Sequence, residues 1–270
     1  MTQLPIVIEP EELEQLLEDP SIVVVDLCKA KQYTQAHIPG AHFVNYGDLV
    51  HIEKPIMGLL PSDEKFSALL SSLGITADTH VIAYDDEGGG CASRFVWTLH
   101  VFGHEKASIL NGGLHSWANE GHALTTEVPQ KHPSTYQLSN TGKYTVDSSY
   151  ISDHLDDTHT ALLDARSLAE YTGAKKFAEK AGHIPGAKHF EWTDGMDRSR
   201  NLRLLPAAVI QQKLDALGLS KDREIIVYCQ SHHRSAFSYV MLRALGYENV
   251  KGYPGSWSDW GNQANTPVEL

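Results

Sequence analysis

The stretch Glu224-Ile-Ile-Val-Tyr-Cys229-Gln-Ser-His-His-Arg234-Ser-Ala-Phe237 decides the fold of this chain. A short apolar run leads to a cysteine, four residues follow, and an arginine then opens an amphipathic segment. The apolar residues of that segment recur at helical spacing: Phe237, Val240, Met241, Leu242 and Leu245. The pattern predicts a strand, a tight loop and a helix, with Cys229 at the carboxyl end of the strand.

This placement makes Cys229 the candidate nucleophile. The first N–H groups of a helix have no partner within the helix and point toward the preceding loop. Loop amides can surround an anion with partial positive charge, and Arg234 adds a permanent cation, so a thiolate or a bound anion is favoured here. We expect six residues to form the active-site loop and its anion-binding site: Gln230, Ser231, His232, His233, Arg234 and Ser235.

Three segments of the chain resemble the rhodanese sulfurtransferases. A cysteine and an arginine separated by four residues, between an apolar strand and a helix, are similar to the active-site loop of that family. Residues 183–187, His-Ile-Pro-Gly-Ala, and residues 255–260, Gly-Ser-Trp-Ser-Asp-Trp, resemble its two other short signatures. The likeness covers nearly all of the chain and is greatest to bacterial tandem-domain rhodaneses, some of which also have paired histidines before the arginine.

The composition is that of an ordinary soluble globular protein. The 270 residues, 41% hydrophobic and 21% charged, are enough for one large domain or two of average size. The N-terminus lacks a basic region followed by an apolar one, so we expect no secretory signal, and no apolar run approaches a membrane span. Three cysteines, an odd number without a close pair, indicate a reducing compartment. A cytoplasmic location is the prediction.

The net charge of −12 argues against nucleic acid as a general partner. The acidity lies almost wholly in the first half: residues 1–145 hold 8 Lys and Arg against 18 Asp and Glu, and residues 146–270 hold 14 against 16. The second half includes Arg198, Arg200 and Arg203 in one short polar segment. This segment suits either a mouth that admits anions or a solvated basic loop, and the sequence leaves both interpretations open.

The chain repeats itself once, at domain size. The paired landmarks come in the same order in the two halves: residues 22–27 with 161–166, 37–41 with 183–187, 73–84 with 217–228, 102–103 with 245–246, and 112–117 with 255–260. A repeat of this length indicates duplication of a whole domain and not a solenoid.

Each half reads as a small α/β domain, because short apolar runs alternate with helical patterns. The predicted fold is two tandem rhodanese-like domains, each a small parallel sheet covered by helices on both faces. Residues 1–124 form the first domain, the polar, proline-containing residues 125–145 form a linker, and residues 146–270 form the catalytic domain.

The two copies diverge where the chemistry is expected. Tyr228-Cys229 aligns with Tyr84-Asp85, so a carboxylate replaces the thiol. The first-half loop is longer and contains Gly88-Gly89-Gly90, which we expect not to hold a rigid amide cradle without other support. Cys91 lies only three residues before Arg94, so the catalytic spacing is not restored. Residues 1–124 are therefore predicted to be a non-catalytic copy that packs against the second domain and completes its cleft.

Other polar residues at strand ends have simpler interpretations. Asp26 and Asp164 each follow a strand and can accept N–H bonds from neighbouring loops; the resemblance implies that Asp164 supports the active-site loop. Cys28 is most simply a packing residue or a partly exposed thiol. The two His-Ile-Pro-Gly segments are expected to shape a turn into the next strand.

His232 and His233 are ambiguous. With Cys229 they form a Cys-x2-His-His cluster, but adjacent ligands on a six-residue loop do not easily close a tetrahedral site, and no fourth ligand is evident. A histidinium near the sulfur helps to keep it ionised or binds an anionic donor. Equally, both side chains can simply fill the rim of the loop. No metal and no other cofactor is predicted.

The resemblance implies that Cys229 attacks a polarised S–S bond, holds the sulfur as a persulfide and passes it to cyanide, a thiol or a protein. Thiosulfate is the first choice of donor and 3-mercaptopyruvate the second. Two positions depart from the pattern of vertebrate rhodaneses. The loop of those proteins has basic residues where this chain has Ser231, and they have an arginine where this chain has Glu170. Mercaptopyruvate sulfurtransferases have small residues in place of the histidines. Arg234 is expected to stay available for an anion.

Two other classes of protein have to be weighed. Cell-cycle tyrosine phosphatases with a rhodanese-like domain also use a cysteine and an arginine, but five residues separate them, and the wider cradle accepts a phosphoryl group. Four residues lie between Cys229 and Arg234, which favours sulfur. A sulfur carrier or sensor without turnover differs only in its acceptor.

Overall fold

The computed structural model describes residues 4–270 and divides into two compact units. Unit 1 takes in the described residues up to Leu49, Pro61–Thr141 and Met196–Leu204, and unit 2 takes in Val50–Leu60, Gly142–Gly195 and Leu205–Leu270. Each unit thus includes one short segment from the other half of the sequence. The sequence-based ranges 1–124 and 146–270 do not include this exchange of residues 50–60 and 196–204 between the units.

Unit 1 is built on a five-stranded parallel sheet with the order β1-β7-β6-β2-β3. Its strands are β1 (Val7–Ile8), β2 (Ile22–Asp26), β3 (His42–Phe43), β6 (His80–Tyr84) and β7 (Ala107–Leu110), with the hairpin β10 (Met196–Asp197) and β11 (Arg203–Leu204). Its helices are α1 (Pro10–Leu16), α2 (Ala30–Gln35), η1 (Tyr46–Asp48), α3 (Asp63–Ser72), α4 (Gly90–Val101) and α5 (Gly113–Asn119).

Unit 2 is built on a four-stranded parallel sheet with the order β13-β12-β8-β9. Its strands are β8 (Thr160–Asp164), β9 (Lys188–His189), β12 (Glu224–Tyr228) and β13 (Val250–Gly252), with the hairpin β4 (His51–Glu53) and β5 (Ile56–Leu59). Its helices are α6 (Ser148–Asp153), α7 (Leu168–Tyr171), η2 (Trp192–Gly195), α8 (Ala207–Ala216), α9 (Arg234–Ala244) and α10 (Ser256–Trp260).

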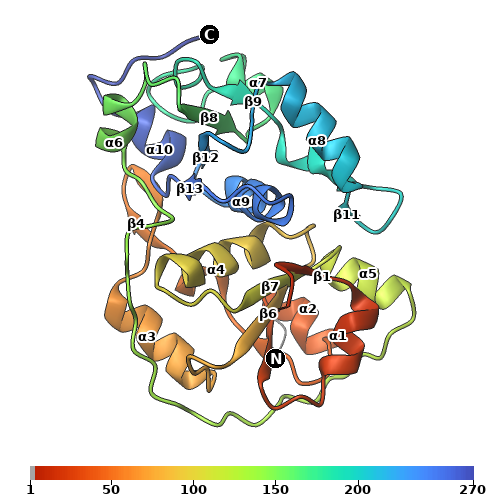
Figure 1. Ribbon diagram of the computed structural model, residues 1–270. Coiled ribbons are helices and arrows are strands. Elements are labelled where there is room, and N and C mark those ends of the chain that lie inside the picture. Colours follow the sequence, from red (N-terminus) through yellow and green to blue (C-terminus); the bar gives the residue numbers. More distant parts are fainter. Residues whose placement is uncertain (1–3) are drawn as a thin grey trace. The chain divides into compact units, whose positions relative to one another are not determined.

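Each sheet carries helices on both faces, as the sequence predicts (Figure 1). In unit 2, Ile226 and Tyr228 of β12 face one way and pack with Trp257 and Trp260 of α10 and with α6. Ile225 and Val227 face the opposite way along the strand, where α9 packs on β12 and β13. Because both faces are covered, β12 and β6 are almost continuously apolar and buried.

The two His-Ile-Pro-Gly segments form turns, which confirms the prediction. In each, the alanine N–H donates to the isoleucine carbonyl three residues earlier, at 3.1 Å for Ala41 and 3.0 Å for Ala187. Proline and a glycine with positive φ occupy the two central positions, as a type II turn requires, with φ of 76° at Gly40 and 75° at Gly186. Each turn leads directly into the edge strand of its sheet, β3 or β9.

Residues 125–141, from the predicted linker, belong to unit 1 and run along α3 and the end of α4. Tyr136 is buried there: its N–H donates to the Ser71 hydroxyl at 3.0 Å, and its carbonyl accepts from Ser67 at 2.6 Å. The segment has no regular secondary structure apart from one bridge, in which Thr125 pairs with His37. Repeated anchoring to the helices therefore fixes its path.

Candidate active site

Cys229 lies where the sequence predicts it, directly after β12 and five residues before the first residue of α9. The side chain is buried, with 1% exposed. The backbone of Cys229 is held by α10 and the turn before it: the Cys229 N–H donates to the Ser256 hydroxyl at 3.2 Å, and its carbonyl accepts from Trp257 at 2.9 Å. The Gln230 carbonyl accepts from the Ser258 N–H at 2.9 Å. Residues 256–258 thus fix the start of the loop.

Ser256 is a residue that the sequence analysis did not single out. Its φ of 50° lies in the left-handed region, which is uncommon for a residue other than glycine. The matching residue of unit 1 is Gly113, with φ of 56°. The N–H of the following residue, Leu114, donates to the Asp85 carbonyl at 2.8 Å. In unit 2 a serine occupies this strained position and supplies the hydroxyl that binds the Cys229 amide. The only signal in the sequence is this replacement of glycine by serine between the two copies.

The surroundings of the Cys229 sulfur favour the thiolate. Burial by itself raises the pKa of the thiol, but the positive charge of Arg234 and hydrogen bonds from Ser235 and the Ser231 backbone outweigh it, so the pKa lies below its ordinary value. Ser235 is fully buried at the start of α9. These are the loop and helix groups that the sequence predicts around the sulfur.

Arg234 departs from one expectation. The sequence leaves its guanidinium available for an anion, but two of its nitrogens donate to the Glu170 carboxylate, at 2.7 and 2.9 Å. Glu170 is buried in α7, where it also closes a capping box with Ser167. Burial alone would raise the pKa of Glu170, but the Arg234 hydrogen bonds prevail and lower it to about 2. Arg234 therefore acts on Cys229 as part of an ion pair, and its side chain is oriented by Glu170.

The two histidines of the loop lie in different surroundings. His232 is fully buried with φ of 54°, and its Nδ1 lies 2.8 Å from the Ser235 hydroxyl, so it is not at the rim. His233 is partly exposed and packs edge-on against Trp192, with ring centroids 5.7 Å apart. Within residues 4–270, no cluster of three possible ligand residues with metal-binding spacing includes Cys229.

Asp164 lies at the end of β8, fully buried. Its carboxylate accepts from the Arg166 N–H at 2.9 Å and from the Arg166 guanidinium at 2.6 Å, and Arg166 also donates to the Gly182 carbonyl at 2.7 Å. Burial and the Asp164 charge raise the pKa of Tyr228, which directly precedes Cys229. Asp164 thus braces the turn after β8 and lies against the residue before the nucleophile.

In unit 1, Asp85 fills the cradle that matches the Cys229 loop. Its carboxylate accepts from the amides of Glu87 at 3.1 Å, Gly89 at 2.8 Å and Ala92 at 2.9 Å. The glycine-rich loop thus has the further support that we expected it to need: its amides converge on an internal carboxylate. Burial and the Glu87 charge raise the pKa of Asp85.

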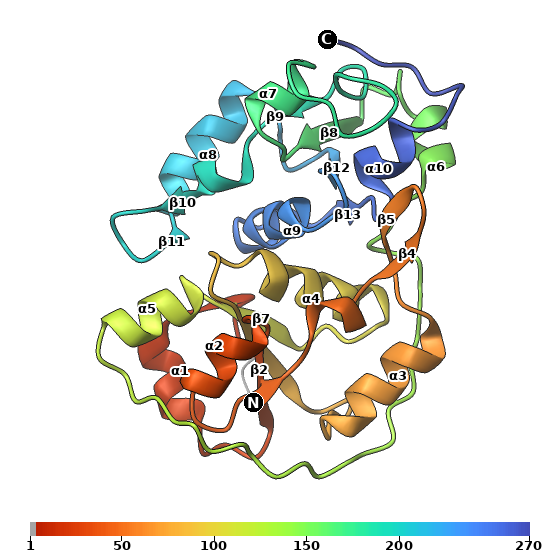
Figure 2. The ribbon, with the colours of Figure 1, turned by 180° about the vertical axis from the view of Figure 1, so that it is seen from behind.

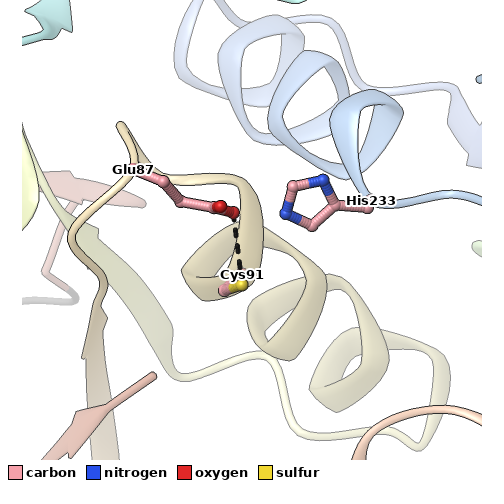
Figure 3. A group of neighbouring side chains, drawn as sticks. All are labelled: Glu87, Cys91 and His233. Carbon is pink, nitrogen blue, oxygen red and sulfur yellow. Dashed lines mark hydrogen bonds between the residues drawn. The ribbon is translucent and has the colours of Figure 1, made fainter. Parts of the chain in front are cut away.

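The other two cysteines are unsuited to nucleophilic attack. Cys28 is buried in the core of unit 1, as the packing interpretation predicts, and Cys91 donates to the Glu87 carboxylate at 3.2 Å (Figure 3). Burial, with Asp26 acting on Cys28 and Asp85 acting on Cys91, raises both pKa values. Both thiols line a cavity of about 310 Å³ with Asp86 and Glu87. Carboxylates in that cavity disfavour an anionic donor.

Arg203 forms its ion pairs within unit 1. Its guanidinium contacts Glu9 at 2.7 Å and Glu120, and only 7% of the residue is exposed. The hairpin that carries it, β10–β11, lies in unit 1. The interpretation of this segment as an open, anion-admitting mouth is therefore wrong for Arg203.

The model of the Rhodanese-like domain matches residues 9–120 and 147–263. The chain belongs to the rhodanese family. A thiosulfate sulfurtransferase of Pseudomonas aeruginosa is 45% identical over 269 residues, covering 100% of this chain and 98% of the relative. A sulfur carrier protein of Thermus thermophilus, TtuD, is 32% identical, with coverage of 97% and 96%. A 3-mercaptopyruvate sulfurtransferase of Escherichia coli is 31% identical, with coverage of 95% of each chain.

Solved structures share the rhodanese fold. The anaerobic ergothioneine biosynthesis enzyme of Chlorobium limicola superposes with a TM-score of 0.88 at 22% identity, over 100% of this chain and 71% of that one. At this identity the likeness concerns the fold alone. In the part of this rhodanese that the structure describes, no helix combines the length and apolar character needed to cross a bilayer.

The charge of Arg234 should be measurable through the pKa of Cys229. We expect Arg234→Ala to raise that pKa by about one unit, because the charge that stabilises the thiolate is lost. At pH values well below both the old and the new pKa, the thiolate fraction and with it the rate of sulfur transfer then fall about tenfold. The pH dependence of the alkylation rate of Cys229 measures the shift.

Two further variants complete this test. Arg234→Lys keeps the charge without the two-pronged contact and should shift the profile less than Arg234→Ala. Arg234→Ala combined with Glu170→Gln removes the carboxylate left unpaired by the single change. An unchanged alkylation profile in Arg234→Ala would contradict the electrostatic role of Arg234.

Proposed function

We propose that this rhodanese is a thiosulfate sulfurtransferase that carries sulfur as a persulfide on Cys229. The observation that supports the proposal most is the contrast among the three thiols: the pKa is lowered at Cys229 and raised at Cys28 and Cys91. Sulfane sulfur transfer needs a thiolate, and an activated thiol next to a helix N-terminus typically has a pKa of about 3.5 to 7.5.

The chemistry proceeds in two displacement steps. The Cys229 thiolate attacks the outer sulfur of thiosulfate, the S–S bond breaks, and sulfite leaves with its electron pair. The resulting persulfide anion lies among the amides and hydroxyl groups that favour the thiolate, which also stabilise this second anion. A thiophilic acceptor such as cyanide or a thiol then removes the outer sulfur and regenerates the thiolate, so the kinetics are ping-pong.

Thiosulfate is proposed as donor because the relative named for it is the more similar: 45% identity, against 31% for the relative named for 3-mercaptopyruvate. Because the Arg234 guanidinium is paired with Glu170, the amides and hydroxyl groups of the loop are the chief groups that bind the anionic donor. The acceptor is proposed only as a class, a thiol or a protein that needs activated sulfur. A cytoplasmic location stays a prediction from the three free cysteines.

One experiment separates the proposed function from the alternatives. The purified protein is incubated with thiosulfate, with 3-mercaptopyruvate or with a phosphate ester, each with and without cyanide. We expect thiosulfate to give thiocyanate over many turnovers, faster than 3-mercaptopyruvate, and no phosphate release. If the protein took up sulfur but did not pass it on to cyanide or thiols, this would indicate a sulfur carrier, the role for which TtuD is named. Phosphate release would contradict the proposal.

Unit 1 is proposed to be a non-catalytic copy, and Asp85→Cys tests this. The new thiol would lie among converging amides but beside Asp86 and Glu87, whose charges oppose the thiolate, as at Cys91. We expect Asp85→Cys in a Cys229→Ser background to take up no sulfur from thiosulfate, as judged by intact mass. Sulfur mapped to position 85 would contradict this view of unit 1.

A further inference from the structure

The hairpin β4–β5 comes from the first half of the sequence but lies in unit 2, beside α10 (Figures 1 and 2). Its second strand contacts the segment that fixes the start of the active-site loop. The Met57 N–H donates to the Ser258 hydroxyl at 3.0 Å, and the Ser258 N–H in turn donates to the Gln230 carbonyl. Through Ser258, β5 is tied to the residue that follows Cys229.

Gly58 of this strand lies directly against the loop. A Cβ atom at Gly58 would lie 2.1 Å from the Ser231 carbonyl oxygen, 2.6 Å from its carbon and 2.7 Å from the Pro254 carbonyl oxygen. All three are backbone atoms, so no side chain can move aside. Gly58 is not at positive φ, so the glycine is required for space and not for conformation. The backbone of β5 is therefore packed directly on the outer side of the Ser231 peptide.

The Ser231 backbone is one of the groups that lower the pKa of Cys229. In a trans peptide the carbonyl and the following N–H point in opposite directions, so the bond from Ser258 to the Gln230 carbonyl orients the Ser231 N–H. The Gly58 backbone, packed on the Ser231 carbonyl, limits the position of the next peptide. His232 itself has the strained φ of 54°. A loop in such a conformation needs support from its surroundings to keep its amides in place.

We propose that β5, with Gly58 at its centre, is a positioning element of the Cys229 site. Its backbone packs against the Ser231 carbonyl and keeps the loop amides in the geometry that stabilises the thiolate and the persulfide. The sulfur-transfer readout rests on the proposed function, but the ionisation of Cys229 does not. Gly58 is a positioning residue, because it acts on the sulfur only through Ser231.

The test is Gly58→Ala in the full-length chain. The added methyl group must displace the Ser231 backbone, so we expect the alkylation profile of Cys229 to move to higher pH by about half a unit or more. Sulfur transfer from thiosulfate should fall by about tenfold, less than the 10²–10³-fold loss typical when an anion-binding donor is removed altogether. Alkylation is followed on the peptide that contains Cys229, so that Cys28 and Cys91 do not contribute.

Gly218→Ala is the matched control. Gly218 follows α8 with φ of 72° and no atom within 4 Å of an added Cβ, so this change costs conformational energy without touching the loop. It should lower stability and leave the pH profile of Cys229 unchanged. A Gly58→Ala protein with the wild-type profile and wild-type transfer would overturn the proposal, as would an equal shift in Gly218→Ala.

Ser258→Ala keeps the proposal testable if Gly58→Ala does not fold. It removes the hydroxyl that binds the Met57 N–H but leaves the Ser258 N–H on Gln230. We expect a smaller shift of the Cys229 profile in the same direction, and no shift would overturn the proposal. If the wild-type protein transferred no sulfur at all, the proposed function would fail, while the alkylation profiles would still decide the role of β5.

Discussion

Replacement of Cys229 by serine is expected to abolish sulfur transfer from thiosulfate to cyanide. A serine hydroxyl stays protonated near neutral pH and forms no persulfide, whereas the Cys229 thiolate is favoured by Arg234 and Ser235. The loss should be on the order of 10⁶-fold, as when the nucleophile of other covalent enzymes is removed. Steady-state thiocyanate production measures it.

Cys28→Ser and Cys91→Ser are the matched controls for this change. Both thiols have raised pKa values, so we expect these variants to keep nearly full activity. Because Cys28 is buried in the core of unit 1, its replacement should lower stability instead. Residual turnover in Cys229→Ser that disappears when Cys91 is also replaced would contradict the assignment.

A piece of the chain that begins at Val146 is expected to lose sulfur transfer by about a hundredfold or more. It contains Cys229 and the whole loop, but of unit 2 it lacks Val50–Leu60 and residues 142–145. Without this hairpin the Ser231 peptide loses the strand packed on it, and the loss of a preorganised anion-binding donor alone typically costs 10²–10³-fold. Thiosulfate:cyanide turnover and thermal unfolding of the piece measure the two effects.

The same piece with residues 50–60 joined to it through a flexible linker is the informative comparison. We expect this second protein to recover stability and part of the activity, because the missing contacts of β5 are supplied within one chain. The account of the hairpin would be contradicted by a piece from Val146 that matches the full-length protein in both measurements.

The local features of this fold could be read from the sequence. Apolar strands such as β12 and β6, the type II turns at Gly40 and Gly186, and the position of Cys229 between strand and helix depend on neighbouring residues. The duplication was visible for the same reason, since each copy repeats these local signals in order.

The features that escaped prediction depend on contacts distant in sequence. Nothing local indicates that β4–β5 belongs with unit 2, because the contact of Gly58 with Ser231 is made by backbone atoms. The pairing of Arg234 with Glu170 joins residues that are 64 positions apart in the sequence, although the capping box at Ser167 does mark Glu170 as a helix-start residue. The three glycines after Asp85 suggested a loose loop, but its carboxylate organises the amides.

The most direct test of the central claim is the mass of the protein before and after sulfur loading. The full-length chain is treated with thiosulfate, freed of excess reagent, digested and mapped, with a second sample treated with cyanide. We expect one added sulfur atom, on the peptide that contains Cys229, which cyanide removes. Sulfur found on Cys28 or Cys91, or a Cys229 peptide that never gains mass while thiocyanate is produced, would contradict it.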